Sequence, residues 1–241
     1  MNNIICNNYS ALSKYYDAIT NTKRRKFLAK EINLIASSID SSNKNILDIA
    51  CGTGNLSIEL SKYSYNIIAF DNSDSMISIF KEKAINIPNI TITNMAMEKF
   101  HSDVKIKLAV CTSFSLTYLK NPEKEKFLRS LYNSLIDGGV FVMDMLHPTA
   151  IFRYFSNQKT RIIEKSSIET KLESYNENSG VYSVSYIVRK NNDSFTETHD
   201  GFVISSQEAI NLLKSIGFRK IAYRERESNS DSSAYELFCY K

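Results

Sequence analysis

Apolar residues recur along this chain with two different spacings, and the spacing changes near residue 44. Residues 9–39 repeat them at helical intervals, which predicts helices over most of that range. Further on, short apolar runs alternate with helical stretches. The runs predict strands at 45–50, 66–70, 89–93, 106–111 and 140–145, and the stretches predict helices at 56–60, 74–84 and 122–135. Strands that alternate with helices indicate a parallel, doubly wound α/β sheet.

Residues 156–203 interrupt this alternation and are predicted to form an antiparallel β insert. The stretch 181–188 carries tyrosine and valine on one face at the period of a strand. The stretches 162–172 and 195–203 also have extended patterns. Because the insert follows the fifth strand, we expect it to act as a lid or as a dimerisation element.

The α/β pattern returns after the insert. Ser205 and Glu208 have the spacing of a capping box, and Gly217 is placed to end the helix that they begin. Two closing strands are predicted at 218–223 and 234–240. The second half of the chain therefore completes the sheet that the first half starts.

Composition is typical of a globular protein. The chain has 241 residues, of which 43% are hydrophobic and 23% charged, and these values exclude wholesale disorder. No repeat or linker divides it, so we expect one domain over residues 1–241, with an N-terminal helical cap over residues 1–42. No apolar run reaches the ~18 residues that span a bilayer, and the first residues lack the pattern of a signal peptide. We expect a cytoplasmic protein that binds no membrane.

The positions of the cysteines, histidines and charged residues restrict the kinds of functional site that we expect in this chain. Four isolated cysteines predict neither a disulfide framework nor a zinc site, and the positions of His101, His147 and His199 are too scattered to predict a metal site. The whole net charge of +4 lies in residues 1–45. That segment includes the basic run 23–26, for which the solvated face of a helix is favoured over a nucleic-acid patch.

The turn after the first strand has the residues of a ligand-binding loop. Gly52 and Gly54 form a GxG motif that would let the backbone approach a ligand at the carboxyl end of a parallel strand. A helix N-terminus follows, and its free N–H groups suit an anionic group. Asp71 ends the second strand, where it is placed to accept hydrogen bonds from both ribose hydroxyls of a nucleoside.

Two classes of ligand bind to this arrangement of loop and helix, and two residues of this chain distinguish between the two classes. A nicotinamide dinucleotide site expects a third glycine where this chain has Ser57. Asp48 lies four residues before Gly52, where its carboxylate would repel a pyrophosphate and attract an ammonium group. The sequence therefore favours S-adenosylmethionine, a nucleoside that carries an amino acid, as the cofactor.

Three segments carry a resemblance to a known family. LDIACGTGN at 47–55 resembles motif I of the class I S-adenosylmethionine-dependent methyltransferases, and FDNSDSMI at 70–77 resembles their second-strand motif. VCTSFSLTYL at 110–119, together with Tyr9, Tyr15, Tyr16 and Asp17 near the N-terminus, is similar to small-molecule members. Of these, the amino-sugar N-methyltransferases and the glycine N-methyltransferase type look nearest. The resemblance covers residues 9–155 and 200–241, and it implies a Rossmann-like sheet that is mostly parallel with an antiparallel last strand.

The resemblance also implies a set of cofactor-binding residues. Asp48 and the backbone of 51–54 would surround the methionine part, with Cys111 and Thr112 beside its amino group. Asn94 falls where the family usually has an aspartate next to the adenine amine. The full set is Tyr9, Tyr16, Asp48, Ala50, Cys51, Gly52, Gly54, Asp71, Asn72, Met76, Asn94, Met95, Ala96, Cys111 and Thr112.

Candidates for catalysis lie near the carboxyl ends of the strands. Tyr118 follows the fourth strand, His147 follows the fifth, and His199 leaves the insert. Each could act as an acid or base toward an acceptor hydroxyl or amine. Each also has a structural alternative, as a pocket wall, a helix cap or an exposed strand residue respectively. We expect Tyr9 near the methyl-bearing end of the cofactor, with Tyr16 in the same closing cap.

The acceptor is expected to be a small molecule. Nucleic-acid amino-methyltransferases usually carry an Asn/Asp-Pro-Pro-aromatic motif after the fourth strand, where this chain reads CTSF, and the insert is nearly neutral rather than basic. We therefore expect a monomer or homodimer that methylates a small-molecule amine or hydroxyl and binds no nucleic acid. The alternatives are a protein or RNA methyltransferase, a catalytically silent S-adenosylmethionine-binding protein and, least favoured, a nicotinamide oxidoreductase.

Overall fold

The computed structural model describes residues 3–6, 9–20, 22–156, 160–163, 165–191, 193–228 and 231–241. The helices are α1 (Ser13–Ile19), α2 (Thr22–Ser38), α3 (Asn55–Leu60), α4 (Asp74–Lys83), α5 (Asn121–Ser134), α6 (Ile151–Ser156) and α7 (Ser206–Ile216), with short 3-10 helices η1 (Met97–Lys99), η2 (Ser115–Tyr118) and η3 (Pro148–Ala150). The strands are β1 (Asn3–Cys6), β2 (Asn45–Ile49), β3 (Asn66–Asp71), β4 (Ile90–Asn94), β5 (Ile106–Cys111), β6 (Leu135–Leu146), β7 (Arg161–Ile163), β8 (Ser166–Asn176), β9 (Val181–Lys190), β10 (Asp193–Phe202), β11 (Lys220–Ser228) and β12 (Asp231–Tyr240).

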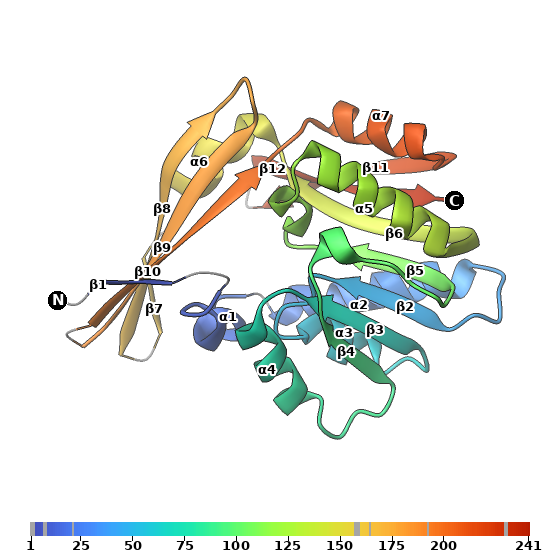
Figure 1. The fold of residues 1–241 in the computed structure, drawn as a ribbon, viewed down its shortest axis with the longest axis horizontal. Helices are drawn as coiled ribbons and strands as arrows, with labels where there is room; N and C mark the ends of the chain where they lie inside the picture. The colour runs from blue at the N-terminus through green and yellow to red at the C-terminus, as the bar shows by residue number, and fades with distance from the viewer. Residues whose placement is uncertain are drawn as a thin grey trace.

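The strands form two sheets that lie beside each other (Figure 1). The larger sheet has the order β11-β12-β6-β5-β2-β3-β4, and β2 to β6 pair in parallel within it. β12 runs antiparallel to both of its neighbours, β6 and β11. The predicted fold, a mostly parallel doubly wound sheet with an antiparallel last strand, is therefore confirmed.

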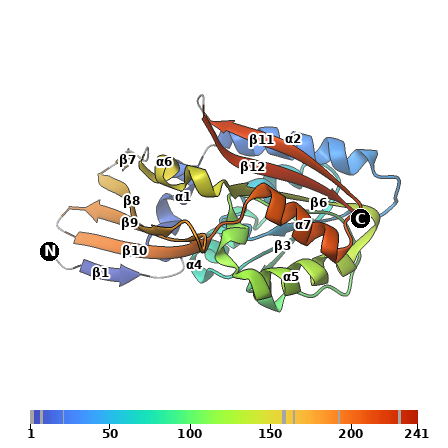
Figure 2. The ribbon, with the colours of Figure 1, turned by 90° about the horizontal axis from the view of Figure 1, so that it is seen from above.

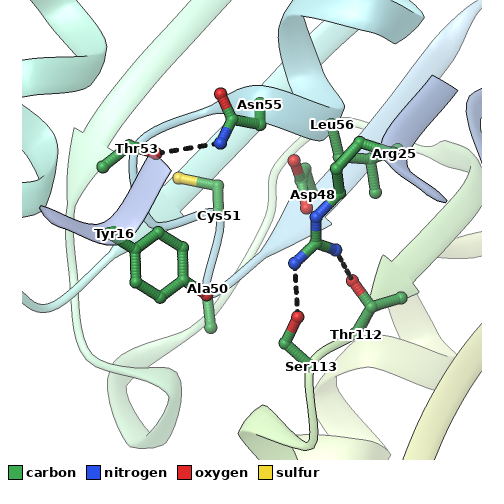
Figure 3. Close-up of a pocket in the computed structure, with 10 residues that line it drawn as sticks. All are labelled: Tyr16, Arg25, Asp48, Ala50, Cys51, Thr53, Asn55, Leu56, Thr112 and Ser113. Atoms are coloured by element: carbon green, nitrogen blue, oxygen red, sulfur yellow. Dashed lines mark hydrogen bonds between the residues drawn. The ribbon is translucent and has the colours of Figure 1, made fainter. Parts of the chain in front are cut away.

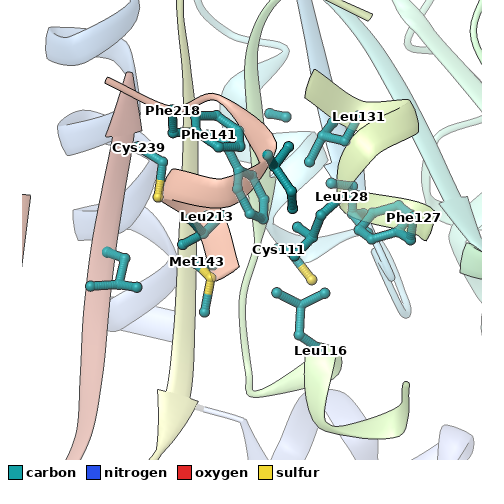
Figure 4. Close-up of a cluster of buried hydrophobic side chains, with 14 of the residues drawn as sticks. Cys111, Leu116, Phe127, Leu128, Leu131, Phe141, Met143, Leu213, Phe218 and Cys239 are labelled. Carbon is teal, nitrogen blue, oxygen red and sulfur yellow. The ribbon is translucent and has the colours of Figure 1, made fainter. Parts of the chain in front are cut away.

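Alternate residues of the inner strands bury opposite faces of the larger sheet. On β2, Ile46 packs on the side of α2, α3 and α4, whereas Leu47 packs on the side of α5 and α7. Parallel sheets need this cover on both faces, and Figure 2 shows the sheet between its two layers of helices. Figure 4 shows the second side, where Phe127 of α5 and Leu213 of α7 belong to the same buried cluster as Phe141 of β6.

The smaller sheet has the order β1-β10-β9-β8-β7. Its strands β7 to β10 pair antiparallel, as predicted for the insert, and β1 adds a parallel edge strand at the start of the chain. The sequence did not predict β1. Leu146, Ile151 and Val203 pack in one apolar cluster with Tyr182, and this cluster ties the root of the insert to the end of β6.

Local sequence signals account for the last helix. The Ser205 hydroxyl accepts a hydrogen bond from the Glu208 N–H, and the Glu208 carboxylate accepts one from the Ser205 N–H, so the predicted capping box is present. Gly217 follows the helix with a φ of 129°, as predicted for its end. Within the described ranges, no helix combines the length and apolar character needed to cross a bilayer.

Candidate functional site

The two glycines of the GxG turn have different tasks. Gly54 has a φ of 78°, and a Cβ atom there would lie only 2.0 Å from the Phe80 ring of α4. Glycine at this position therefore lets α4 pack directly against the turn. Gly52 has a φ of 55°, and the nearest atom to an added Cβ belongs to Tyr16, at 3.6 Å. Its open side faces a large cavity, which Gly52 helps to line.

Asp71 stands at the end of β3, beside this turn. Its Oδ2 accepts a hydrogen bond from the Gly52 N–H at 2.8 Å, and its Oδ1 accepts one from the Ser73 N–H at 2.9 Å. A carboxylate offers about four acceptor positions, more than the backbone N–H groups around Asp71 occupy, so acceptor capacity remains for a ligand. Burial raises the pKa of Asp71, and the hydrogen bonds from backbone N–H groups oppose that shift.

The large cavity has a volume of about 390 Å³ and lies over the carboxyl ends of the strands. This volume is within the usual range for small-molecule sites, ~300–1,000 Å³. The insert closes one side of it through Thr198, His199 and Asp200 of β10. The sequence-predicted residues that line it are Tyr9, Tyr16, Ala50, Gly52, Asp71, Asn72, Met76, Met95, Tyr118 and His199.

A second, smaller cavity adjoins the first and shares Tyr16, Ala50 and Ser113 with it. The sequence-predicted residues that line it are Tyr16, Asp48, Ala50, Cys51 and Thr112. Asp48 accepts a hydrogen bond from the Ser57 hydroxyl at 2.6 Å. Burial raises the pKa of the Asp48 carboxyl to about 6, against the opposing effects of that hydrogen bond and of the Arg25 charge. Asp48 is therefore mainly a carboxylate at neutral pH.

Arg25 is a residue of the smaller cavity that the sequence analysis did not select. Its guanidinium donates hydrogen bonds to the Thr112 hydroxyl, at 3.2 Å, and to the Ser113 hydroxyl (Figure 3). The helical period could have identified Arg25 as a residue that faces inward, because Ala29 and Ile32 on the same side of α2 are buried. The smaller cavity thus places a cation and a carboxylate together, as an amino-acid zwitterion requires.

The structure corrects both interpretations of the basic run 23–26 that were made from the sequence. Arg24 turns inward and pairs with Asp144 at 3.4 Å and with Glu236 at 3.3 Å. Arg25 points into the smaller cavity, so only Lys23 and Lys26 are exposed. Arg24 therefore belongs to an ion-pair network, and Arg25 belongs to the wall of the smaller cavity. The run forms neither a solvated helix face nor a continuous basic patch.

A strained loop carries Ser113 to the edge of both cavities. Ser113 and Phe114 have φ values of 63° and 64°, a left-handed conformation that costs non-glycine residues roughly 1 kcal/mol or more each. The buried Asp144 compensates, because its Oδ1 accepts a hydrogen bond from the Phe114 N–H at 2.7 Å. Arg226 pairs with the other oxygen of Asp144 at 2.6 Å. This buried ion-pair network therefore fixes the loop that Arg25 binds.

Asp17 fastens the N-terminal segment over the GxG turn. Its carboxylate accepts hydrogen bonds from the Thr53 hydroxyl, from Asn55 at 2.8 Å and from Lys83 at 2.7 Å. Burial raises the pKa of Asp17, but these hydrogen bonds outweigh it and hold the pKa below its ordinary value. Through this contact α1 is held against both α3 and α4, with Tyr16 next to it lining both cavities.

Tyr9, Tyr118 and His199 meet at the insert side of the large cavity. The Tyr9 and Tyr118 hydroxyls form a hydrogen bond, and the centre of the His199 ring lies 4.4 Å from that of Tyr9 and 6.0 Å from that of Tyr118. Desolvation by the cavity walls raises the pKa of both phenols well above the ordinary value. Both therefore keep their protons at neutral pH, so Tyr118 offers a hydrogen bond rather than a base.

Five sequence-predicted residues lie outside both cavities. The Cys111 side chain is buried in the core beside α5 (Figure 4), and the exposed Asn94 amide donates to Asp74. His147 faces the closing strands, with its Nε2 3.1 Å from the Glu225 carboxylate. The five are Gly54, Asn94, Ala96, Cys111 and His147.

Residues 46–139 match a family model described as a methyltransferase domain. The chain is 27% identical over 210 residues to a carboxy-S-adenosyl-L-methionine synthase of Nautilia profundicola, covering 84% of this chain and 82% of that protein. An S-adenosylmethionine-dependent methyltransferase of Clostridium acetobutylicum has a similar structure, with a TM-score of 0.78 at 19% identity over 96% of this chain and 98% of that one. The sugar N-methyltransferase KedS8 of a Streptoalloteichus species has a TM-score of 0.71 at 14% identity over 95% and 92% of the two chains.

Proposed function

Because this chain is an S-adenosylmethionine-dependent methyltransferase, we propose that it methylates the amine of a small molecule. The charges of the large cavity carry this proposal. Among the described residues that line it, the acidic ones are Asp71, Glu98 and Asp200, and none is a lysine or arginine. Such a cavity attracts a cationic amine and repels an acceptor that bears a carboxylate or phosphate.

The residues of the two cavities fit the cofactor. Arg25 and Asp48 suit the carboxylate and the ammonium group of its methionine part, respectively. Asp71 has acceptor positions left for the ribose hydroxyls. Phe70 and Met76 supply apolar surface for a flat base. When bound, S-adenosylmethionine supplies an electrophilic methyl group on a sulfonium.

The chain's own residues then have to position the acceptor and exclude water, which is what transfer from an activated donor needs most. In this proposal the hydroxyls of Tyr9 and Tyr118 orient the acceptor. His199 removes a proton from the acceptor amine, and the insert acts as the lid. The sugar N-methyltransferase among the similar structures supports an amine as the acceptor class.

The proposal is tested by a methyl-transfer screen with S-adenosylmethionine labelled in its methyl group. Amines and amino sugars form one panel, and the analogues with a hydroxyl in place of the amine form the matched panel. We expect label to pass to members of the amine panel. Transfer to bulk RNA or to protein, with none to either panel, would overturn the small-molecule assignment.

Asp71→Ala tests the ribose site. Charge-assisted hydrogen bonds of this kind contribute roughly 1.5–3 kcal/mol, so the affinity for S-adenosylmethionine should fall about tenfold to a hundredfold. Calorimetric titration measures it, and circular dichroism checks that the variant is folded. Asp74→Ala is the matched control, because Asp74 bonds Asn94 outside the cavities. Equal affinity of the wild type and the folded Asp71→Ala variant would remove Asp71 from the site.

A further inference from the structure

Glu197 and His199 form a buried pair on β10 that the sequence analysis recognised only in part. They stand two residues apart on one face of the strand, with 0% and 8% of their surfaces exposed. Oε2 of Glu197 accepts hydrogen bonds from the Ala11 and Leu12 N–H groups, each at 3.2 Å. Oε1 of Glu197 and Nε2 of His199 lie 3.4 Å apart, and both are buried without a hydrogen-bond partner among the residues that the structure describes.

Burial of this pair determines which ring nitrogen of His199 carries the proton. A buried polar atom without a partner costs about 1–3 kcal/mol, and here two such atoms face each other. A proton on Nε2 gives both atoms a partner, because a carboxylate oxygen can only accept. The neutral imidazole carries one proton, so Nδ1 is then left as an acceptor.

The other groups that face His199 do not compete with Glu197 in deciding the position of its proton. Its ring is surrounded by Tyr9 from the N-terminal segment, Tyr118 from η2 and Tyr186 from β9, with ring centres 4.4 to 6.0 Å away. Burial raises the pKa of all three phenols, so they are neutral at neutral pH. Glu197 is therefore the acidic neighbour that decides which ring nitrogen holds the proton.

We propose that Glu197 is a positioning residue that holds neutral His199 with its proton on Nε2 and so presents Nδ1 as the base toward the acceptor. The inference rests on the proposed amine methylation. Nδ1 takes one proton from the acceptor ammonium group, and the freed nitrogen lone pair forms the new bond to the methyl carbon. The carbon–sulfur bond breaks with its electron pair left on sulfur. The imidazolium then releases its proton to water.

The same contact links the base to the N-terminal segment. Ala11 and Leu12 directly precede α1, and their N–H groups hold the Glu197 carboxylate in place. His199 is therefore correctly oriented only when this segment is seated. Seating it also brings Tyr9 and Tyr16 to the cavity.

Glu197→Gln gives a sharp test because the glutamine has only one way to fit. The Ala11 and Leu12 N–H groups require an acceptor, so the amide oxygen takes the place of Oε2 and the NH₂ group faces His199. Nε2 must then accept, and the proton of the imidazole moves to Nδ1. ¹⁵N NMR of the imidazole distinguishes the two tautomers, and the three histidines of the chain are assigned with single replacements.

The expected result is an Nε2–H tautomer of His199 in the wild-type protein and an Nδ1–H tautomer in Glu197→Gln. With an acceptor from the screen, kcat should fall about tenfold or more, a loss comparable to that from replacing the partner of a metal-ligating histidine, while KM for S-adenosylmethionine stays nearly constant. Glu169→Gln is the matched control, because Glu169 pairs with Arg189 on the exposed face of the same sheet. It should change neither tautomer nor kcat.

Different results would overturn the role of Glu197 and the proposed methylation of an amine. An Nδ1–H tautomer in the wild-type protein overturns the role of Glu197, and this measurement needs neither a variant nor an acceptor. An unchanged kcat in a folded Glu197→Gln variant whose tautomer has inverted overturns it as well. If the tautomers behave as expected but no amine accepts the methyl group, the proposed function fails and the Glu197–His199 contact stands.

Discussion

Replacement of His199 with phenylalanine is expected to lower kcat by about 100-fold or more, the loss typical of removing an acid–base group. The affinity for S-adenosylmethionine should change little, because His199 lines the insert side of the large cavity, whereas Arg25 and Asp48 line the adjoining smaller one. Phenylalanine keeps a ring against Tyr9 but removes the nitrogen that faces Oε1 of Glu197, so circular dichroism has to show that the variant is folded. Single-turnover kinetics with an acceptor from the amine panel, together with titration of the cofactor, separate the two effects.

His147→Phe provides the control for that experiment. The sequence alone suggested His147 and His199 equally, but His147 contacts Glu225 beside the closing strands and lines neither cavity. Its replacement should leave kcat within about twofold. Tyr118→Phe removes a hydroxyl but no base, so its effect should be smaller than that of His199→Phe. Equal activity of the wild type and the folded His199→Phe variant would leave the lid with a steric role only.

Arg25→Ala should weaken the binding of S-adenosylmethionine by about 100-fold. A guanidinium can form two parallel hydrogen bonds to a carboxylate, and together they contribute roughly 3 kcal/mol, the upper part of the range for charged hydrogen bonds. The variant also leaves the hydroxyls of Thr112 and Ser113 without their donor. Calorimetric titration of S-adenosylmethionine measures the loss.

Two further variants identify its cause. Lys26→Ala removes a neighbouring positive charge from the exposed side of α2, and it should leave the affinity unchanged. Arg25→Lys keeps the charge but loses the two parallel hydrogen bonds, so its affinity should fall between those of the wild type and Arg25→Ala. If Arg25→Ala and Lys26→Ala had the same affinity, the methionine carboxylate would have to bind elsewhere.

The sequence by itself determined the layout of the sheet and the position of the GxG turn beside Asp71. The strands β2, β3 and β5 are short apolar runs, and parallel pairing brings their carboxyl ends to one edge. Gly52, Gly54 and Asp71 are close to those ends along the chain. Their arrangement therefore follows from local conformation and from the direction of the strands, which a periodic pattern can reveal.

Side-chain direction at strand ends needed the tertiary structure. Cys111 and Thr112 are adjacent in sequence, yet Cys111 is buried in the core beside α5 and Thr112 lines the smaller cavity. His147 follows β6, but it turns toward the closing strands. Proximity to the end of a strand was thus insufficient, because successive residues of a strand point to opposite faces.

Contacts between distant segments were decided only by the fold. Arg25 on α2 meets Ser113 after β5, and Glu197 on β10 meets the Ala11 N–H, across 88 and 186 residues of chain. No spacing in the sequence encodes such a pair. Each exists because burial leaves a charged group without water, and the group must then bond whichever polar partner the packed helices and sheets bring to it.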